Sequence, residues 1–199
     1  MMYSIKNLKL TKHPMYILLI GLISLVSLLP GLANSAESKV LKDYHMSIYK
    51  DMQGSVDGVE LFTKVSGKNE FFGVTCSSQS PLPVFQVVMF ENQIMSETPK
   101  LLSVNLQVDK VPVKVELQGI LKVTDTTEEL SNKVRIEVVT QRGSSLQNLQ
   151  KQYLNLLTEL RKGKTLSIEL KHRTLEPKKI EFSLQGLDSL LKPYQDLCF

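Results

Sequence analysis

The sequence has few of the residues from which catalytic and metal sites are usually built. Its 199 residues include two cysteines, three histidines and no tryptophan. Two of the histidines, His45 and His172, lie beyond the N-terminal segment, and neither stands in the spacing of a metal-ligand motif. No serine lies in a Gly-x-Ser-x-Gly motif of the hydrolase type. We therefore predict a protein that is not an enzyme and that uses no metal and no cofactor.

The chain also lacks a cluster of basic residues. Its formal net charge is +4, but three of its lysines and none of its acidic residues fall within residues 1–36, so the charge of the remainder is +1. Nucleic-acid-binding domains usually carry a basic patch, often with aromatic residues between the charges. Because residues 37–199 show no such pattern, we expect no nucleic-acid partner.

Residues 1–36 have the pattern of an export signal. A lysine-containing start precedes an apolar run over residues 16–32, and Pro30-Gly31 is followed by small residues up to Ala36. This pattern predicts a secretory signal peptide that is cleaved near Ala36, a periplasmic location and no stable membrane span after cleavage. A retained membrane anchor is the alternative, because an apolar run of about 17 residues is the lower limit for a spanning helix.

The remaining residues, 37–199, have the length of a single domain with a hydrophobic core. They contain both cysteines, Cys76 and Cys198. An oxidising compartment favours disulfides, and two cysteines in one chain allow one intramolecular pair. We therefore predict a Cys76–Cys198 disulfide.

The alternation of apolar and polar residues predicts a β-rich domain. The expected strands cover residues 44–49, 59–65, 71–76, 84–90, 102–108, 111–117, 120–123, 134–139, 165–170 and 179–184. Between the strands at 134–139 and 165–170, the apolar residues from Leu146 to Leu160 recur instead with the period of an amphipathic helix. This helix is expected to end at Gly163. This number of strands implies a sandwich or a strongly curved sheet. We predict an α+β fold with an antiparallel, β-sandwich-like sheet, two packed helices and one disulfide.

The second helix is expected after Gly186, where the strand pattern changes abruptly to helical spacing. We predict that Gly186 is a structural turn residue with a positive φ angle. Pro193 lies inside this helical pattern and would remove a backbone hydrogen bond, so a kink or a new helical start is expected there.

Two further motifs are weak. Gly163-Lys164-Thr165 is similar to the end of a phosphate-binding loop, but the glycine that such a loop needs is replaced by Thr158. The oxygen-bearing residues between Asp51 and Glu60 faintly suggest a calcium loop, yet Val56 stands where the glycine would be needed. The order of elements around the first motif is also helix then strand, whereas a phosphate-binding loop needs strand then helix. A solvated turn explains the second motif better.

The C-terminal run 182–199 resembles the ending of VasI/TagO-type accessory proteins of type VI secretion. In that family a Phe-x-Leu-x-Gly-Leu turn, here Phe182 to Leu187, precedes a final cysteine and an aromatic residue, here Cys198 and Phe199. Cys76 stands in the place of the first half-cystine, and Tyr44 in that of an aromatic residue near the first strand.

The resemblance implies a non-catalytic periplasmic protein that supports assembly or firing of a type VI secretion system. Its partners would be proteins of the cell envelope, such as components of the secretion apparatus. The same ending also resembles invasion-associated locus B-type exported proteins. The alternative function is therefore an exported binding protein of that type or an inhibitor of a cell-envelope hydrolase.

Overall fold

A computed structural model describes residues 36–90, 100–125 and 130–199. The predicted signal peptide therefore lies outside the described residues, except for Ala36. The domain predicted for residues 37–199 falls in one compact unit.

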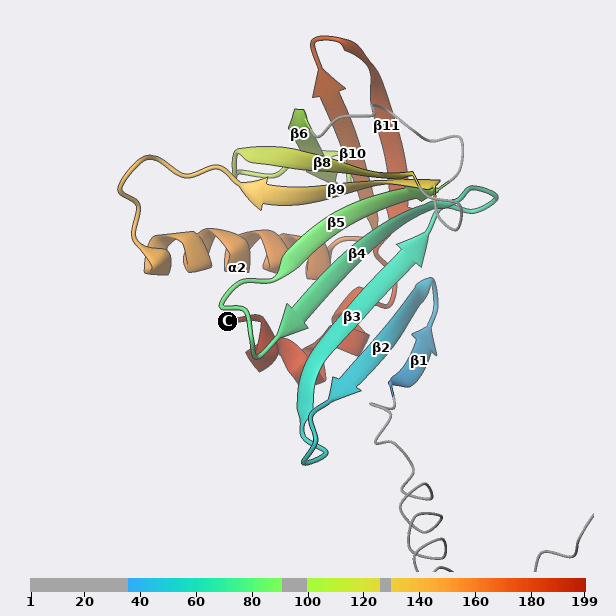
Figure 1. Cartoon of the computed structure of the whole chain (residues 1–199), viewed down its shortest axis with the longest axis vertical. Coiled ribbons are helices and arrows are strands. Elements are labelled where there is room, and N and C mark those ends of the chain that lie inside the picture. Colours follow the sequence, from blue (N-terminus) through green and yellow to red (C-terminus); the bar gives the residue numbers. More distant parts are fainter. Residues whose placement is uncertain (1–35, 91–99, 126–129) are drawn as a thin grey trace, which may run out of the picture. The chain divides into compact units, whose positions relative to one another are not determined.

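The described strands form one antiparallel sheet of eleven strands. They are β1 (Glu37–Leu41), β2 (Tyr44–Lys50), β3 (Val56–Lys64), β4 (Glu70–Ser77), β5 (Val84–Phe90), β6 (Lys100–Val108), β7 (Val111–Pro112), β8 (Leu117–Asp125), β9 (Leu130–Val138), β10 (Thr165–His172) and β11 (Leu175–Ser183). The order across the sheet is β1-β2-β3-β4-β5-β9-β8-β6-β10-β11, and β7 pairs with β6. The sheet curls into a half-barrel (Figure 1).

This architecture confirms the antiparallel β-rich fold, the helices and the disulfide. Of the two sheet shapes expected, the sheet is strongly curved and is not clearly a sandwich. Alternation along a strand shows only that one of its faces is buried. It does not show whether that face packs against a second sheet or against the inside of a curled one. Here the sheet curls, and its buried face packs on the helices and on itself.

Helix α2 (Leu146–Lys162) covers part of the inner face. The hydroxyl of its N-cap residue, Ser145, accepts a hydrogen bond from the Asn148 amide at 3.2 Å. The buried side of the helix carries Tyr153, whose ring stacks on Phe85 of β5 at a centroid distance of 5.9 Å. The Tyr153 hydroxyl also accepts a hydrogen bond from the Val138 amide. As predicted, the helix gives way to extended backbone at Gly163.

The C-terminal segment is attached to the sheet by the predicted disulfide. Cys76 of β4 is bonded to Cys198, and both side chains are buried. Cys198 ends the 3₁₀ helix η1 (Lys192–Cys198), which follows helix α3 (Leu187–Leu191). Pro193 lies in the first turn of η1, so the α-helix changes to a tighter helix at the position where the proline predicts a break.

Gly186 forms the turn between β11 and α3. Its φ angle is 104°, a left-handed conformation that side chains rarely adopt. A Cβ atom at this position would also lie 2.3 Å from the carbonyl oxygen of Leu41, the last residue of β1. The turn therefore packs directly on the backbone of the N-terminal hairpin.

Two contacts join β4 and β11 across the inner face of the curled sheet. The Lys178 ammonium lies 2.6 Å from Oε1 of Glu70, a carboxylate that is 1% exposed. Beside this ion pair, the rings of Phe72 and Phe182 pack at 5.8 Å. A carboxylate so deeply buried requires its cation, so these contacts tie an edge strand to the middle of the sheet.

Candidate functional site

The pairing between β6 and the chain that follows it is interrupted. Val108 pairs with Val111 across the Asp109-Lys110 turn, and Val104 pairs with Leu117. On β6, Val104 and Val108 are four positions apart. Their partners on the returning segment, Leu117 and Val111, are six positions apart. The two extra residues cannot remain in the ladder, and they form a bulge.

The bulge covers residues 113–116. Pro112 has no N–H to donate, and the last bond of the hairpin runs from the Val113 amide to the Leu106 carbonyl at 3.1 Å. At the other end of the bulge, the Glu116 carbonyl accepts a hydrogen bond from the Val139 amide at 2.9 Å. The displaced segment is thus held by backbone hydrogen bonds on both sides.

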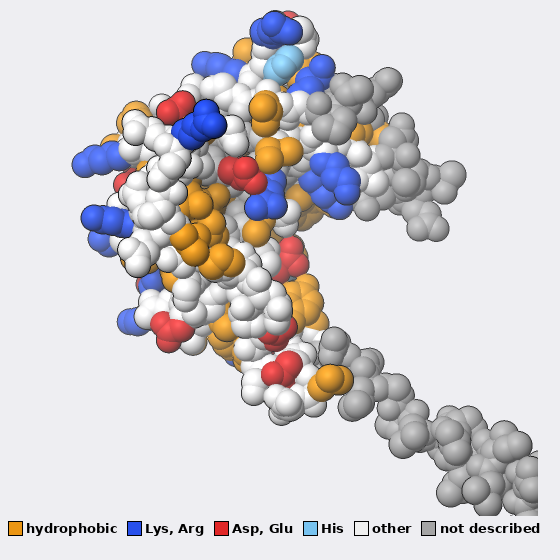
Figure 2. All heavy atoms as spheres, turned by 60° about the vertical axis from the view of Figure 1, so that its left-hand side comes forward, with side chains coloured by type: hydrophobic (Ala, Val, Ile, Leu, Met, Phe, Trp, Pro, Cys, Tyr) orange, Lys and Arg blue, Asp and Glu red, His pale blue; other side chains and the backbone are white. Residues whose placement is uncertain are grey.

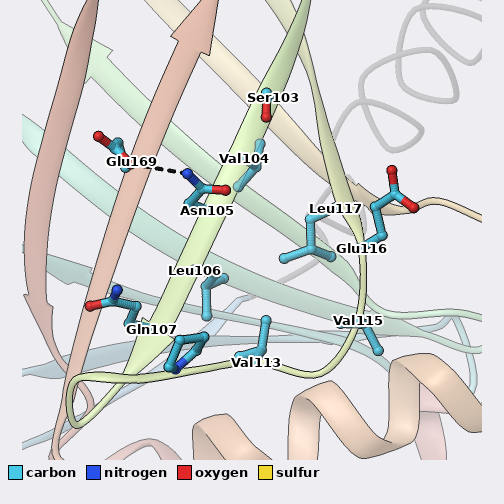
Figure 3. Close-up of a pocket in the computed structure, with 11 residues that line it drawn as sticks. Ser103, Val104, Asn105, Leu106, Gln107, Val113, Val115, Glu116, Leu117 and Glu169 are labelled. Atoms are coloured by element: carbon cyan, nitrogen blue, oxygen red, sulfur yellow. Dashed lines mark hydrogen bonds between the residues drawn. The ribbon is translucent and has the colours of Figure 1, made fainter.

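A groove of about 500 Å³ opens where the bulge leaves the sheet (Figure 3). This volume lies within the usual range for ligand pockets. The lining residues come from β6, β10 and the segment after the turn: Ser103, Val104, Asn105, Leu106, Gln107, Pro112, Val113, Val115, Glu116, Leu117 and Glu169.

One side of the groove is polar. Asn105 of β6 donates a hydrogen bond from Nδ2 to Oε2 of Glu169 on β10 at 3.0 Å (Figure 3). The Lys171 ammonium lies 2.8 Å from the same oxygen. Lys171 and then Asn105 are the main causes that hold the pKa of Glu169 below its ordinary value. Glu169 is therefore a carboxylate at neutral pH, and both of these contacts are made to its Oε2.

The other side of the groove is apolar. It is formed by Val113 and Val115 of the bulge and by Leu117 at the start of β8 (Figure 3). The two valines are half-buried and pack on the edge of the core, while Leu117 belongs to the core. The groove thus places a hydrogen-bonding wall opposite a hydrocarbon wall.

The tip of the hairpin beside the groove is fixed by Asp109. This residue has a φ angle of 49°. Its Oδ1 accepts hydrogen bonds from the Lys164 amide at 3.0 Å, the Thr165 amide at 2.8 Å and the Thr165 hydroxyl at 3.1 Å. The amides of Thr165 and then Lys164 lower the pKa of Asp109. The Gly163-Lys164-Thr165 motif is therefore the α2–β10 turn, and its amides bind a carboxylate of the same chain.

The charge of the groove differs from that of the chain. The chain has a net charge of +4, yet the lining residues include two glutamates and no lysine, arginine or histidine. On the face shown in Figure 2, basic, acidic and hydrophobic side chains are interspersed. The charged residues that line the groove are thus acidic, and one of them, Glu169, is paired with Lys171 from outside the lining.

The residues singled out in the sequence do not line the groove. Cys76, Cys198 and Gly186 hold the C-terminal segment. His45 stacks on Phe62 with a centroid distance of 5.3 Å, and Nδ1 of His172 lies 2.8 Å from Oγ1 of Thr174. The histidines therefore lie apart from the groove.

The carboxylates of the calcium-like segment bind hydrogen-bond donors of the chain itself. Oδ1 of Asp51 accepts hydrogen bonds from the amides of Gln53 and Ser55, both at 2.9 Å. Asp57 accepts a hydrogen bond from the Ser78 hydroxyl. Across the residues that the structure describes, no three His, Cys, Asp or Glu side chains are placed to hold a metal ion.

A second, smaller pocket of about 310 Å³ lies between α2 and η1, with Leu154, Arg161 and Phe199 in its lining. The Arg161 guanidinium already donates to Asp188 and to Gln195. Within the described ranges, no helix combines the length and the apolar character needed to cross a bilayer.

The sequence pattern missed the groove because residues 111–117 alternate as a regular returning strand would. Pro112 is the one available signal, since a proline inside a paired strand often marks a bulge. No family model and no curated protein matches this chain.

Proposed function

We propose that this chain is an exported, non-catalytic protein that binds another protein in the cell envelope. The groove between β6 and the bulge carries this proposal. Its main-chain anchors hold it open, and it presents a polar wall and an apolar wall to the same ligand. Pre-formed sites of this kind avoid the entropy cost of ordering a loop on binding.

The arrangement of titratable groups supports binding over catalysis. The groove offers carboxylates, amides and a hydroxyl. For catalysis, one of its carboxylates would have to act as a general base within hydrogen-bond reach of the proton that it removes. Glu169 is paired with Lys171, and its pKa is lowered, which makes it a weak base. These groups are suited to holding a ligand.

The proposed partner system is type VI secretion, with the protein acting in the periplasm to support assembly or firing of the apparatus. The support comes from the resemblance of residues 182–199 to the ending of the VasI/TagO-type family. The export pattern of residues 1–36 and the Cys76–Cys198 disulfide agree with an oxidising compartment.

Deletion of the gene tests this role. We expect the deletion strain to lose release of the secreted tube protein, measured in culture supernatants. A plasmid copy of the full chain should restore release, and a copy that starts at Glu37 without the leader should not. Normal release in the deletion strain would contradict the secretion role.

A variant carrying both His45→Ala and His172→Ala separates binding from catalysis. Because neither histidine lines the groove, this variant should restore release as well as the unaltered chain does. Loss of release with an unchanged melting temperature would instead favour an enzyme.

A further inference from the structure

We propose that the groove binds an extended peptide segment of the partner and that a lysine or arginine side chain of this segment pairs with Glu169. This inference rests on the proposed protein-binding function and names the chemistry of the segment that is bound. Charge, hydrogen-bonding capacity and shape each support it.

The charge of the groove selects a cation. Glu169 and Glu116 are the charged residues of its lining. The Asn105 amide and the Lys171 ammonium both contact Oε2 of Glu169, so a guanidinium or ammonium of the segment would approach through Oε1. The Lys171 side chain is 44% exposed, so it can remain on Oε2 while a second cation approaches the other oxygen.

The polar wall suits a peptide better than a free polyamine. Ser103, Asn105 and Gln107 occupy alternate positions on the outer side of β6, which places them roughly 7 Å apart. This is also the spacing of alternate residues in an extended peptide. Side-chain amides both donate and accept hydrogen bonds, as a peptide group does, whereas a polyamine only donates.

The opposite wall provides room for small apolar side chains. Val113 and Val115 are half-buried and form a hydrocarbon surface on the side of the groove across from Glu169, in front of the buried Leu117. A β-branched or alanine residue next to the basic residue would cover this surface. The expected segment is therefore short and extended, and it alternates a basic residue with small apolar ones.

Fluorescence anisotropy with a labelled peptide tests the proposal on the protein purified in its exported form. The probe is a blocked heptapeptide of alternating threonine and valine with arginine at its centre. Two control peptides carry alanine or glutamate at that position. We expect the arginine peptide to bind about tenfold more tightly than the alanine peptide, because a hydrogen bond to a charged group is worth at least this factor.

Glu169→Gln should remove the preference for arginine, and Asn105→Ala should weaken binding of all three peptides. Glu181→Gln is the matched control, because it removes the same charge from an exposed position on the neighbouring strand β11. Thermal melts of each variant show whether the fold is kept. If Glu169→Gln and Glu181→Gln melt alike but only the first loses the preference, the assignment of Glu169 is supported.

Three results would overturn the inference. They are equal binding of the arginine and alanine peptides, tighter binding of the glutamate peptide, and displacement of the arginine peptide by spermidine at equal concentration. The last would assign the groove to small amines. A normal secretion phenotype in the deletion strain would overturn the secretion role alone, whereas failure of the arginine peptide to bind would overturn this inference alone.

Discussion

The C-terminal segment and the groove are opposite in how their side chains are used. In the C-terminal segment, Leu187, Leu191 and Cys198 are each 0% exposed, and the chain is bonded covalently to β4. In the groove, Ser103 and Asn105 are exposed and the backbone departs from its ladder. The first region uses its residues to hold the fold, and the second leaves hydrogen-bonding groups for a ligand. Substitutions should therefore cost stability in the first region and binding in the second.

Loss of the disulfide should have the largest effect. Cys76 and Cys198 are separated by 122 residues, and in the chain-entropy model a loop of that length stabilises the fold by roughly 4–5 kcal/mol. We expect a Cys76→Ser/Cys198→Ser variant to lose about 2–5 kcal/mol of unfolding free energy in urea denaturation. His172→Ala, at the half-buried last position of β10, should change it little. Two alkylatable thiols in the unaltered, non-reduced protein would contradict the disulfide.

Gly186→Val should have the next largest effect. The substitution places a branched side chain at a positive φ and pushes its Cβ against the Leu41 carbonyl. We expect a loss of on the order of 1–3 kcal/mol in the same denaturation experiment. Gly54→Val is the matched control, because Gly54 also has a positive φ but a Cβ atom there would meet no other atom within 4 Å. If the two variants lose equal stability, the close approach of Leu41 adds nothing.

Asp109→Asn should have a smaller, pH-dependent effect. The folded-state pKa of Asp109 is lowered by the Thr165 and Lys164 amides, so its ionised form stabilises the fold. This contribution is present above the ordinary aspartate pKa of about 3.9 and is lost as pH falls through the lower folded-state pKa. Melting temperatures of the two proteins should therefore differ at pH 6 and converge on acidification. A constant difference in melting temperature across this pH range would contradict a stabilising role of the ionised Asp109 carboxylate.

Much of the fold could be predicted from local pattern. The end of α2 at Gly163 follows from the loss of its leucine stripe, and the break at Pro193 follows from the missing N–H. The pairing of Cys76 with Cys198 needed only the cysteine count and the export pattern. The strand β1 was not predicted. All five of its residues are exposed, so its sequence, ESKVL, has no need to alternate apolar and polar residues and does not do so.

The sequence by itself determined which faces of the strands are buried, where the helices end and which cysteines pair. Each of these depends on neighbouring residues or on a count. Only the tertiary structure decided that β5 pairs with β9, that β6 pairs with β10, and that Lys178 reaches Glu70. The tertiary structure also created the groove. Two residues are left over opposite β6 because Val104 pairs with Leu117 and Val108 pairs with Val111. Alternation fixes which way a side chain points but not which strand lies beside it, since that choice depends on burial and hydrogen bonding between distant segments.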